Sequence, residues 1–172
     1  LLLFHKYRDG ARTPALEHLV EGALYAASNG TVNLHFTVSH EHLPLFRQHV
    51  AENLLKLENK YKVHYNISFS EQSPATDTLA ANPDNTPYRT EDGRLLFRPG
   101  GHGALIENLN QIDADVVFVK NIDNAVPDRL KKDTVHYKQV LAGVLVQEQA
   151  RVFALLQDPS VSEEEKELLR RP

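Results

Sequence analysis

The sequence predicts an α/β domain with a largely parallel sheet. Segments with the periodicity of strands and of helices alternate along the chain. Residues 115–120 form a continuous apolar run, of the kind that is buried on both faces of a parallel sheet. A length of 172 residues with 41% apolar content suffices for one domain with a hydrophobic core. We therefore expect residues 1–172 to form a single domain.

Composition excludes several classes of protein. The absence of cysteine excludes disulfides, cysteine-ligated metal sites and thiol catalysis, and it fits a reducing compartment such as the cytoplasm. No run approaches 18 apolar residues, so the sequence predicts no membrane span. A net charge of −4 supplies no basic field for nucleic acid or anionic lipid. We expect a cytoplasmic protein that binds neither nucleic acid nor membrane.

The first elements are predicted from local signals. Residues 1–4 are strand-like, and because the sequence contains no methionine we expect it to be an internal piece of a longer protein. Thr13 and Pro14 predict a helix start, with threonine as the N-cap and proline at the first helical position. Apolar residues then recur at helical spacing, and Asn29-Gly30 is expected to end this helix.

The next segments predict a strand, a helix and a second strand. Residues 31–38 alternate between apolar and polar side chains, which is typical of a strand with one buried face. A helix is expected over residues 41–60, and residues 63–69 alternate again. The regular pattern is lost from residue 70 on, and a polar loop over 70–93 is long enough to be functional or disordered.

The second half of the chain returns to regular patterns. The sequence predicts, in order, a short strand at 95–97, a glycine-rich turn, a helix at 104–109, a strand at 115–120, a loop at 121–127 and a helix at 136–156. Ser162 and Glu165 form a capping-box pattern, so residues 159–172 are expected to contain a charged terminal helix. In open α/β sheets ligands bind beyond the carboxyl ends of strands, so the loops there are the candidate sites.

The glycine-rich turn is the sharpest local motif. Gly100, Gly101 and Gly103 let the backbone approach a ligand closely, and His102 lies among them. Such a loop suits a nucleotide base edge or a phosphate. It matches neither of the standard phosphate-binding glycine patterns, because no Lys-Ser/Thr follows and the glycine spacing differs. The alternative is a tight turn between a strand and a helix.

Two other loops carry polar candidates. Asp123 and Asn124 follow the apolar run, a familiar position for holding Mg²⁺ against phosphates; the alternative is an Asx turn or a helix cap. Gln72 follows the strand at 63–69 and has both a donor and an acceptor for a base edge; the alternative is an exposed loop residue.

His40 and His42 have the spacing of two metal ligands on an extended segment, but no third ligand is evident.

Four segments together carry a family resemblance. They are Leu-Leu-Phe-His-Lys-Tyr at 2–7, Arg-Thr-Pro at 12–14, Phe-Arg-Pro-Gly-Gly-His-Gly-Ala-Leu at 97–105 and Val-Lys-Asn-Ile-Asp-Asn at 119–124. They resemble an uncharacterised bacterial family that is itself similar to the UDP-sugar pyrophosphorylases, which are sugar-1-phosphate nucleotidyltransferases. The resemblance covers most of the chain. It implies a Rossmann-related, GT-A-like nucleotidyltransferase fold with a mostly parallel sheet flanked by helices.

The resemblance also implies roles for the motif residues. Gln72 and the loop of Gly100, Gly101, His102 and Gly103 occupy the places that hold the uracil in such enzymes. Asp123 occupies the place of the residue that holds Mg²⁺ near the α-phosphate, and Asn124 would contact substrate. The implied partners are UTP and a sugar phosphate, with Mg²⁺ as cofactor. No protein nucleophile is implied, so no catalytic residue is assigned.

One departure from these enzymes leaves alternatives open. Their N-terminal glycine-rich loop with its Pro-Lys signature, which cradles the triphosphate, would fall before residue 1, so we expect this segment alone to be inactive. A catalytically silent relative that binds a nucleotide or sugar nucleotide is one alternative. A structural α/β module whose glycines only form turns is the other.

Overall fold

The computed structural model of the protein describes residues 2–171. Leu1, where we expected the first strand to begin, and Pro172, the last residue of the expected terminal helix segment, lie outside them. Contacts between residues divide the chain into unit 1, Leu1–Asp115, and unit 2, Val116–Pro172, and each unit is described here by itself. The single domain expected over 1–172 stays a prediction.

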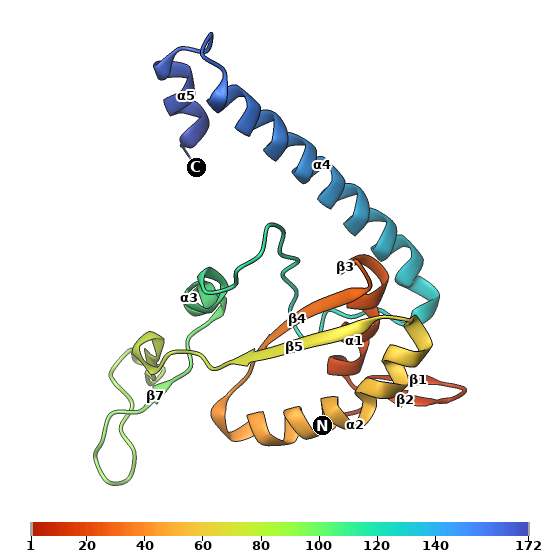
Figure 1. Ribbon diagram of the computed structural model, residues 1–172. Coiled ribbons are helices and arrows are strands. Elements are labelled where there is room, and N and C mark those ends of the chain that lie inside the picture. Colours follow the sequence, from red (N-terminus) through yellow and green to blue (C-terminus); the bar gives the residue numbers. More distant parts are fainter. Residues whose placement is uncertain (1, 172) are drawn as a thin grey trace. The chain divides into compact units, whose positions relative to one another are not determined.

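The described part of unit 1, residues 2–115, contains three small sheets and three α-helices (Figure 1). Its elements are β1 (His5–Tyr7), β2 (Gly10–Arg12), α1 (Pro14–Tyr25), β3 (Ala27–Ser28), β4 (Thr31–Thr37), η1 (His40–His42), α2 (Leu43–Tyr61), β5 (His64–Ser70), η2 (Pro74–Thr76), β6 (Thr78–Leu79), β7 (Phe97–Arg98), η3 (His102–Leu105) and α3 (Ile106–Asn110). The elements labelled η are single 3-10 turns.

The predicted start of α1 is confirmed, but its predicted end is wrong. The Thr13 side chain accepts a hydrogen bond from the backbone N–H of Leu16, and Pro14 is the first helical residue. The helix ends at Tyr25. Asn29 and Gly30, with φ of 49° and 75°, instead form the two-residue turn of the β3–β4 hairpin, which needs the left-handed conformation at both positions.

The predicted strand–helix–strand unit is confirmed. β4 and β5 pair in parallel over their whole length, from Thr31 opposite His64 to Thr37 opposite Ser70. The helix α2 connects them, as a parallel pair requires. The helix expected at 41–60 begins two residues later than predicted, because residues His40–His42 form a 3-10 turn.

The predicted fold class, a Rossmann-related and mostly parallel GT-A-like sheet flanked by helices, is wrong. The strands form a two-stranded sheet β1-β2, a three-stranded sheet β3-β4-β5 and a two-stranded sheet β6-β7. Within the described residues, β4 and β5 are the one parallel pair of named strands. The chain is a mixed α/β protein with small, short sheets.

Two mistaken strand assignments account for this difference. Residues 115–120 form no strand, and Val119 keeps 65% of its surface exposed, so this apolar run is not the buried central strand that we expected. The strand expected at 95–97 is the two-residue β7. Its antiparallel partner β6 lies inside the segment predicted as a loop. A strand needs a neighbour to satisfy its backbone groups, and a short apolar run does not specify one.

The core of unit 1 lies on one face of the β4–β5 pair. Residues of α1, α2, β4 and β5 form a single buried cluster; they are Ala15, Leu16, Leu19, Val20, Val32, Phe36, Phe46, Val50, Leu57 and Tyr65. Gly22 brings α1 close to β4, because an added Cβ would lie 3.0 Å from a Val32 methyl group. The rings of Phe36 and Phe46 pack with centroids 5.1 Å apart.

The opposite face of this pair is polar. Asn33, His35 and Thr37 of β4 stand directly across from Asn66, Ser68 and Ser70 of β5. These cross-strand neighbours are joined by side-chain hydrogen bonds, including one of 3.0 Å from Asn66 Nδ2 to Asn33 Oδ1. The two helices α1 and α2 therefore cover the apolar face, while the polar face ends at the loops that follow β4 and β5.

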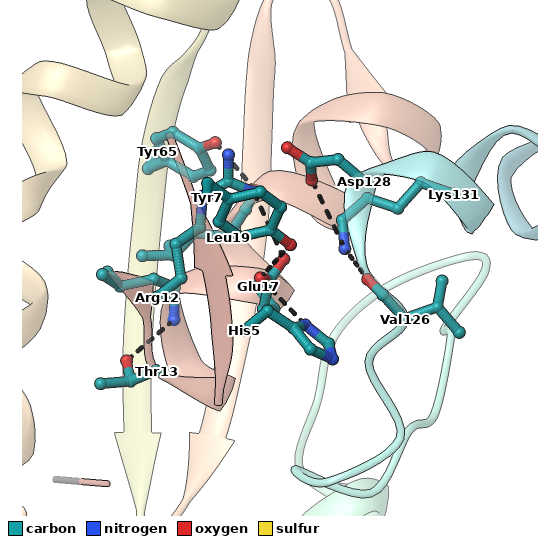
Figure 2. Close-up of polar contacts among 11 residues, drawn as sticks. His5, Tyr7, Arg12, Thr13, Glu17, Leu19, Tyr65, Val126, Asp128 and Lys131 are labelled. Carbon is teal, nitrogen blue, oxygen red and sulfur yellow. Dashed lines mark hydrogen bonds and ion pairs between the residues drawn. The ribbon is translucent and has the colours of Figure 1, made fainter. Parts of the chain in front are cut away.

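A fully buried carboxylate joins the first hairpin to α1 (Figure 2). Glu17 Oε1 accepts a 2.6 Å hydrogen bond from the Tyr7 hydroxyl and lies 3.1 Å from His5 Nδ1. Its other oxygen lies 3.4 Å from Arg12 Nη1, and the Arg12 guanidinium stacks over the Tyr7 ring at 4.1 Å. This cluster supplies the buried carboxylate with the donors that it needs in a low-dielectric interior.

Unit 2 is helical. It contains η4 (Asp128–Leu130), the long helix α4 (Lys131–Gln157) and α5 (Glu163–Arg170). Helix α4 includes the helix expected at 136–156 and begins five residues earlier, where the buried Lys131 ammonium donates to the Val126 carbonyl (Figure 2). The predicted capping box of α5 is confirmed, because Ser162 and Glu165 each bond the other's backbone N–H.

Candidate functional site

The structure brings Gln72 and the glycine-rich loop together. Gln72 follows β5, and the chain returns to it through β7 and the loop that begins at Gly100. A Cβ placed on Gly100 would lie 2.7 Å from the Thr76 carbonyl oxygen and 3.4 Å from Gln72 Nε2. Two segments that the sequence separates by 28 residues therefore lie side by side at the carboxyl end of β5.

The Gln72 side chain is held in place by its own loop. Its Nε2 donates a 3.0 Å hydrogen bond to Thr76 Oγ1, and that hydroxyl donates at 2.6 Å to the Ser73 carbonyl. The side chain is half-buried. The amide therefore has a fixed orientation. Its NH₂ group can donate a hydrogen bond to a base edge, and its carbonyl oxygen can accept one.

The three glycines of the loop differ in what surrounds them. Gly100 is confined by Thr76 and by the Ala104 Cβ at 3.0 Å, so this position excludes any larger residue. Gly101 and Gly103 have no atom within 4 Å of an added Cβ and are exposed, as is His102. The loop thus presents open backbone to solvent beside Gln72, where a ligand has room to approach.

The helix after the loop is shorter than the sequence predicts. The expected helix at 104–109 is a 3-10 turn at His102–Leu105 followed by the five-residue α3. A helix of barely more than one turn adds little dipole to a site, since the macrodipole is a sum over aligned peptides. An approaching ligand would therefore depend on individual N–H groups of this loop.

Asn108 is a structural residue of this region that sequence reasoning missed. It lies on α3, is buried, and its Nδ2 donates to Ser70 Oγ at 2.8 Å and to the Glu71 carbonyl at 2.9 Å. Its Oδ1 is also buried and accepts no hydrogen bond from the described residues. Asn108 thereby fastens the helix after the glycine loop to the end of β5. The short sequence of α3 gave no signal for this role, because its partners are distant in the chain.

His35 extends this polar cluster along the sheet. Its Nδ1 lies 2.7 Å from Ser68 Oγ and its Nε2 lies 2.8 Å from Ser70 Oγ, so the imidazole bridges two hydroxyls of the neighbouring strand. Burial lowers the pKa of His35 below its ordinary value. The ring is therefore neutral at pH 7, with one nitrogen donating and the other accepting.

Protonation of His35 should make the stability of the folded chain depend on pH. Because its pKa is lower in the folded chain, the unfolded chain binds the proton more readily, and stability falls as the pH drops from about 7 through the folded pKa. We expect a pKa below about 6.5 for His35 in an NMR titration of the ring protons. We also expect His35→Gln to flatten the decline of the melting temperature between pH 7 and pH 5.

A matched substitution separates this effect from general acid destabilisation. His40 has a side chain that is 91% exposed, and its Nδ1 pairs with Glu71 at 3.1 Å. We expect His40→Gln to flatten the decline less than His35→Gln does. Equal effects of the two substitutions, or a His35 pKa above 7, would contradict the assignment.

The histidines considered as metal ligands have other partners. His40 contacts Glu71, and His42 Nδ1 lies 2.5 Å from Ser39 Oγ. Among residues 2–171, no group of three or more His, Asp or Glu side chains is placed to hold a metal ion.

Asp123 and Asn124 lie in unit 2. Both are exposed, in a turn closed by a 3.1 Å hydrogen bond from the Asn124 N–H to the Asn121 carbonyl. This turn is closed by the backbone alone, and both side chains are accessible. An exposed carboxylate with an adjacent amide has the donor chemistry of a Mg²⁺ site completed by phosphate oxygens and water, since Mg²⁺ commonly takes only one or two carboxylates from the protein.

Comparison with known proteins gives a family. A family model described as Domain of unknown function (DUF4301) matches residues 1–171. The chain belongs to this family. The DUF4301 match includes both units and every candidate residue discussed above. No curated protein and no solved structure matches the chain.

Within residues 2–171, no helix combines the length and the apolar character that crossing a bilayer requires.

Proposed function

We propose that the chain is part of a sugar-1-phosphate nucleotidyltransferase similar to the UDP-sugar pyrophosphorylases. The observation that supports this most directly is the proximity of Gln72 and Gly100 beyond the end of β5. These are the two segments that the resemblance assigns to uracil binding. In this proposal the protein acts in the cytoplasm on UTP and a sugar phosphate, in keeping with its lack of cysteine.

Each part of the site then has a defined task. The Gln72 amide, oriented by Thr76, pairs with the donor–acceptor edge of the base. The exposed backbone at Gly101, His102 and Gly103 lies against the base and orients it. An oxygen of the sugar phosphate attacks the α-phosphorus, the bond from that phosphorus to the β-phosphate oxygen breaks, and pyrophosphate leaves. Such a reaction depends on positioning and charge neutralisation rather than on a protein nucleophile.

Asp123 and Asn124 are the residues that would hold the metal ion. When bound, Mg²⁺ supplies charge neutralisation at the phosphates. The carboxylate of Asp123 would hold the ion directly, and the Asn124 amide would contact a phosphate or the sugar. Both side chains are exposed and therefore accessible to an ion from solvent.

A titration of UTP with and without Mg²⁺ tests this proposal. In calorimetry on the full-length protein that contains this chain, we expect Mg²⁺-dependent binding that Asp123→Asn weakens by about tenfold or more, as expected on losing a charged partner. Asp113→Asn is the matched control, because it removes one exposed carboxylate from a loop without touching the motif. A pyrophosphate-release assay with sugar 1-phosphates then distinguishes turnover from binding.

The outcomes separate the alternatives. Binding without pyrophosphate release from any sugar phosphate would point to the catalytically silent relative. Absence of heat with every nucleoside triphosphate would exclude both binding proposals and leave a structural module. Equal loss in Asp123→Asn and Asp113→Asn would remove Asp123 from the site.

A further inference from the structure

The strand β5 forms one edge of its sheet. Among residues 2–171 the order of this sheet is β3-β4-β5, so β5 has a neighbouring strand on one side only. The His64 N–H donates to the Gly30 carbonyl, and the Ser70 carbonyl accepts from the Val38 N–H. The backbone polar groups of successive residues in a strand point to opposite sides, so the even-numbered residues of β5 bond β4. The odd-numbered residues direct their N–H and C=O groups outward.

Side chains cap the outward backbone groups at both ends of this edge. The Tyr65 N–H donates a 3.0 Å hydrogen bond to Glu58 Oε1, and the Glu71 carbonyl, just beyond β5, accepts from Asn108 Nδ2 at 2.9 Å. Between these caps, the outward groups of Ile67 and of its neighbours face no other strand in the described part of the chain. The open edge therefore extends over the middle of β5.

This edge lacks the features that usually prevent strands of different molecules from pairing. Edge strands of natural proteins commonly carry lysine, proline or a bulge. The sequence of β5 contains neither lysine nor proline, and β5 pairs with β4 in unbroken register through all seven residues. Its side chains Ile67 and Phe69 are only partly buried against the core. An added strand would bond the outward backbone groups and cover more of these side chains.

The helix α2 places opposite charges beside the two ends of this edge. Arg47 and Glu58 are about three turns apart at 3.6 residues per turn, so they lie on the same side of α2. The Arg47 guanidinium lies 5.2 Å from the centroid of the Phe69 ring, beside the carboxyl end of β5. Glu58 caps Tyr65 at the amino end, where its Oε1 also lies 2.9 Å from His64 Nδ1.

We propose that this edge pairs in antiparallel orientation with β5 of a second copy of the chain. A two-fold axis at Ile67 places Phe69 of each copy directly opposite Tyr65 of the other. The Ile67 N–H of each copy then donates to the Ile67 carbonyl of the other, and each Phe69 N–H donates to the opposite Tyr65 carbonyl. The same axis brings Arg47 of each copy beside Glu58 of the other, so an ion pair forms at both ends of the interface.

The order of charges on α2 is the reason for assigning a second copy to this edge. An identical edge in antiparallel orientation presents a negative group to Arg47 and a positive group to Glu58. The pairing does not depend on the nucleotidyltransferase activity, because Gln72 and Gly100 lie beyond the end of β5.

Sedimentation equilibrium of the full chain tests this pairing. We expect a reversible equilibrium between monomer and dimer. Arg47→Glu and Glu58→Arg should each raise the dissociation constant by about tenfold or more, because each places like charges together at both ends of the interface. An equimolar mixture of the two variants should recover the dimer, since every contact between unlike copies again joins opposite charges.

Lys56→Glu is the matched control for the charge substitutions. It makes the same change in net charge as Arg47→Glu at another exposed residue of α2, and Lys56 lies on the side of the helix that faces the first hairpin. It should leave the dissociation constant unchanged. Equal weakening by Lys56→Glu and Arg47→Glu would show a general charge effect and overturn the proposal.

The absence of cysteine allows a separate test of the register. Asn66 of one copy should lie opposite Ser68 of the other, in a pair that is not hydrogen-bonded and has Cα atoms about 4.5 Å apart. Oxidation of a mixture of Asn66→Cys and Ser68→Cys chains should therefore join unlike chains by a disulfide. Each variant alone should form far less, because its two cysteines are about 7–8 Å apart on the diagonal of the pair.

Three further results would overturn the proposal. They are a chain that stays monomeric at every accessible concentration, a mixture of Arg47→Glu and Glu58→Arg that does not recover the dimer, and disulfides that form equally in the cysteine mixture and in each cysteine variant alone. The crosslinking result does not depend on the charge variants, so it decides the register even if Glu58→Arg fails to fold.

Discussion

Replacing Glu17 with alanine should lower the free energy of unfolding by about 3–5 kcal/mol, the usual result of removing one partner from a buried ion pair. Glu17 is fully buried and accepts the Tyr7 hydroxyl at 2.6 Å. Without it, Arg12 loses a carboxylate 3.4 Å away while remaining largely buried. The Tyr7 hydroxyl and His5 lose the same acceptor. Urea denaturation followed by circular dichroism measures the change.

Glu52→Ala is the matched control for this prediction. Glu52 lies on the exposed face of α2, where it accepts one hydrogen bond from Gln48. We expect its replacement to change stability by no more than about 0.5 kcal/mol, as is usual for surface positions. If Glu17→Ala does not fold, Glu17→Gln retains the shape and one acceptor and should lose less stability. A loss below about 1 kcal/mol for Glu17→Ala would contradict the role of the cluster.

The second large effect is expected at Gly100. In Gly100→Ala the new methyl group would lie 2.7 Å from the Thr76 carbonyl oxygen and 3.0 Å from the Ala104 Cβ, so the two segments must move apart. Overpacking of this kind costs about 1–3 kcal/mol. Because Thr76 also orients the Gln72 amide, we expect nucleotide affinity to fall together with stability.

The neighbouring glycine provides the control. Gly101 has no atom within 4 Å of an added Cβ, and its φ of −71° suits any residue. Gly101→Ala should therefore keep stability within about 1 kcal/mol of the unsubstituted chain. Denaturation curves and UTP titrations of the two variants, measured side by side, test the assignment. Equal behaviour of the two alanine variants would mean that Gly100 is only a turn residue.

The elements that the sequence predicted correctly are those specified by neighbouring residues. The Thr13 cap, the capping box at Ser162 and the alternating strand at 31–38 each depend on side chains within a few positions of one another. The parallel pairing of β4 and β5 also followed, because a helix-length crossover between two strands favours that arrangement.

The errors arose where distant partners decide the structure. Residues 115–120 have the composition of a buried strand, but the boundary between the two units falls within them and they form no strand. Thr78 and Leu79 sit in a polar stretch without strand periodicity, and they form a strand because Phe97 and Arg98 are available to pair with them. Local periodicity carries no information about such partners.

The candidate site shows the same division. The sequence alone identified Gln72 and Gly100 as candidate binding residues, because both follow predicted strands. Their proximity, seen in the 3.4 Å between Gln72 Nε2 and a Cβ placed on Gly100, could not be predicted from the sequence. Asn108 could not be recognised, because its partners, Ser70 and Glu71, lie 38 and 37 residues away in the chain.

The short β6–β7 pairing has a consequence for how this chain can vary in length. Thr78 and Leu79 are held opposite Arg98 and Phe97, so the segment between them leaves the body of unit 1 and returns to the same place. Lengthening a flexible loop adds little entropic cost once its ends are fixed, about 0.6 kcal/mol for each doubling. Insertions or a peptide tag at the exposed turn around Asn85 would therefore leave the spacing of Gln72 and Gly100 unchanged. The positions of Gln72 and Gly100 are in this way independent of the length and sequence of the segment between β6 and β7.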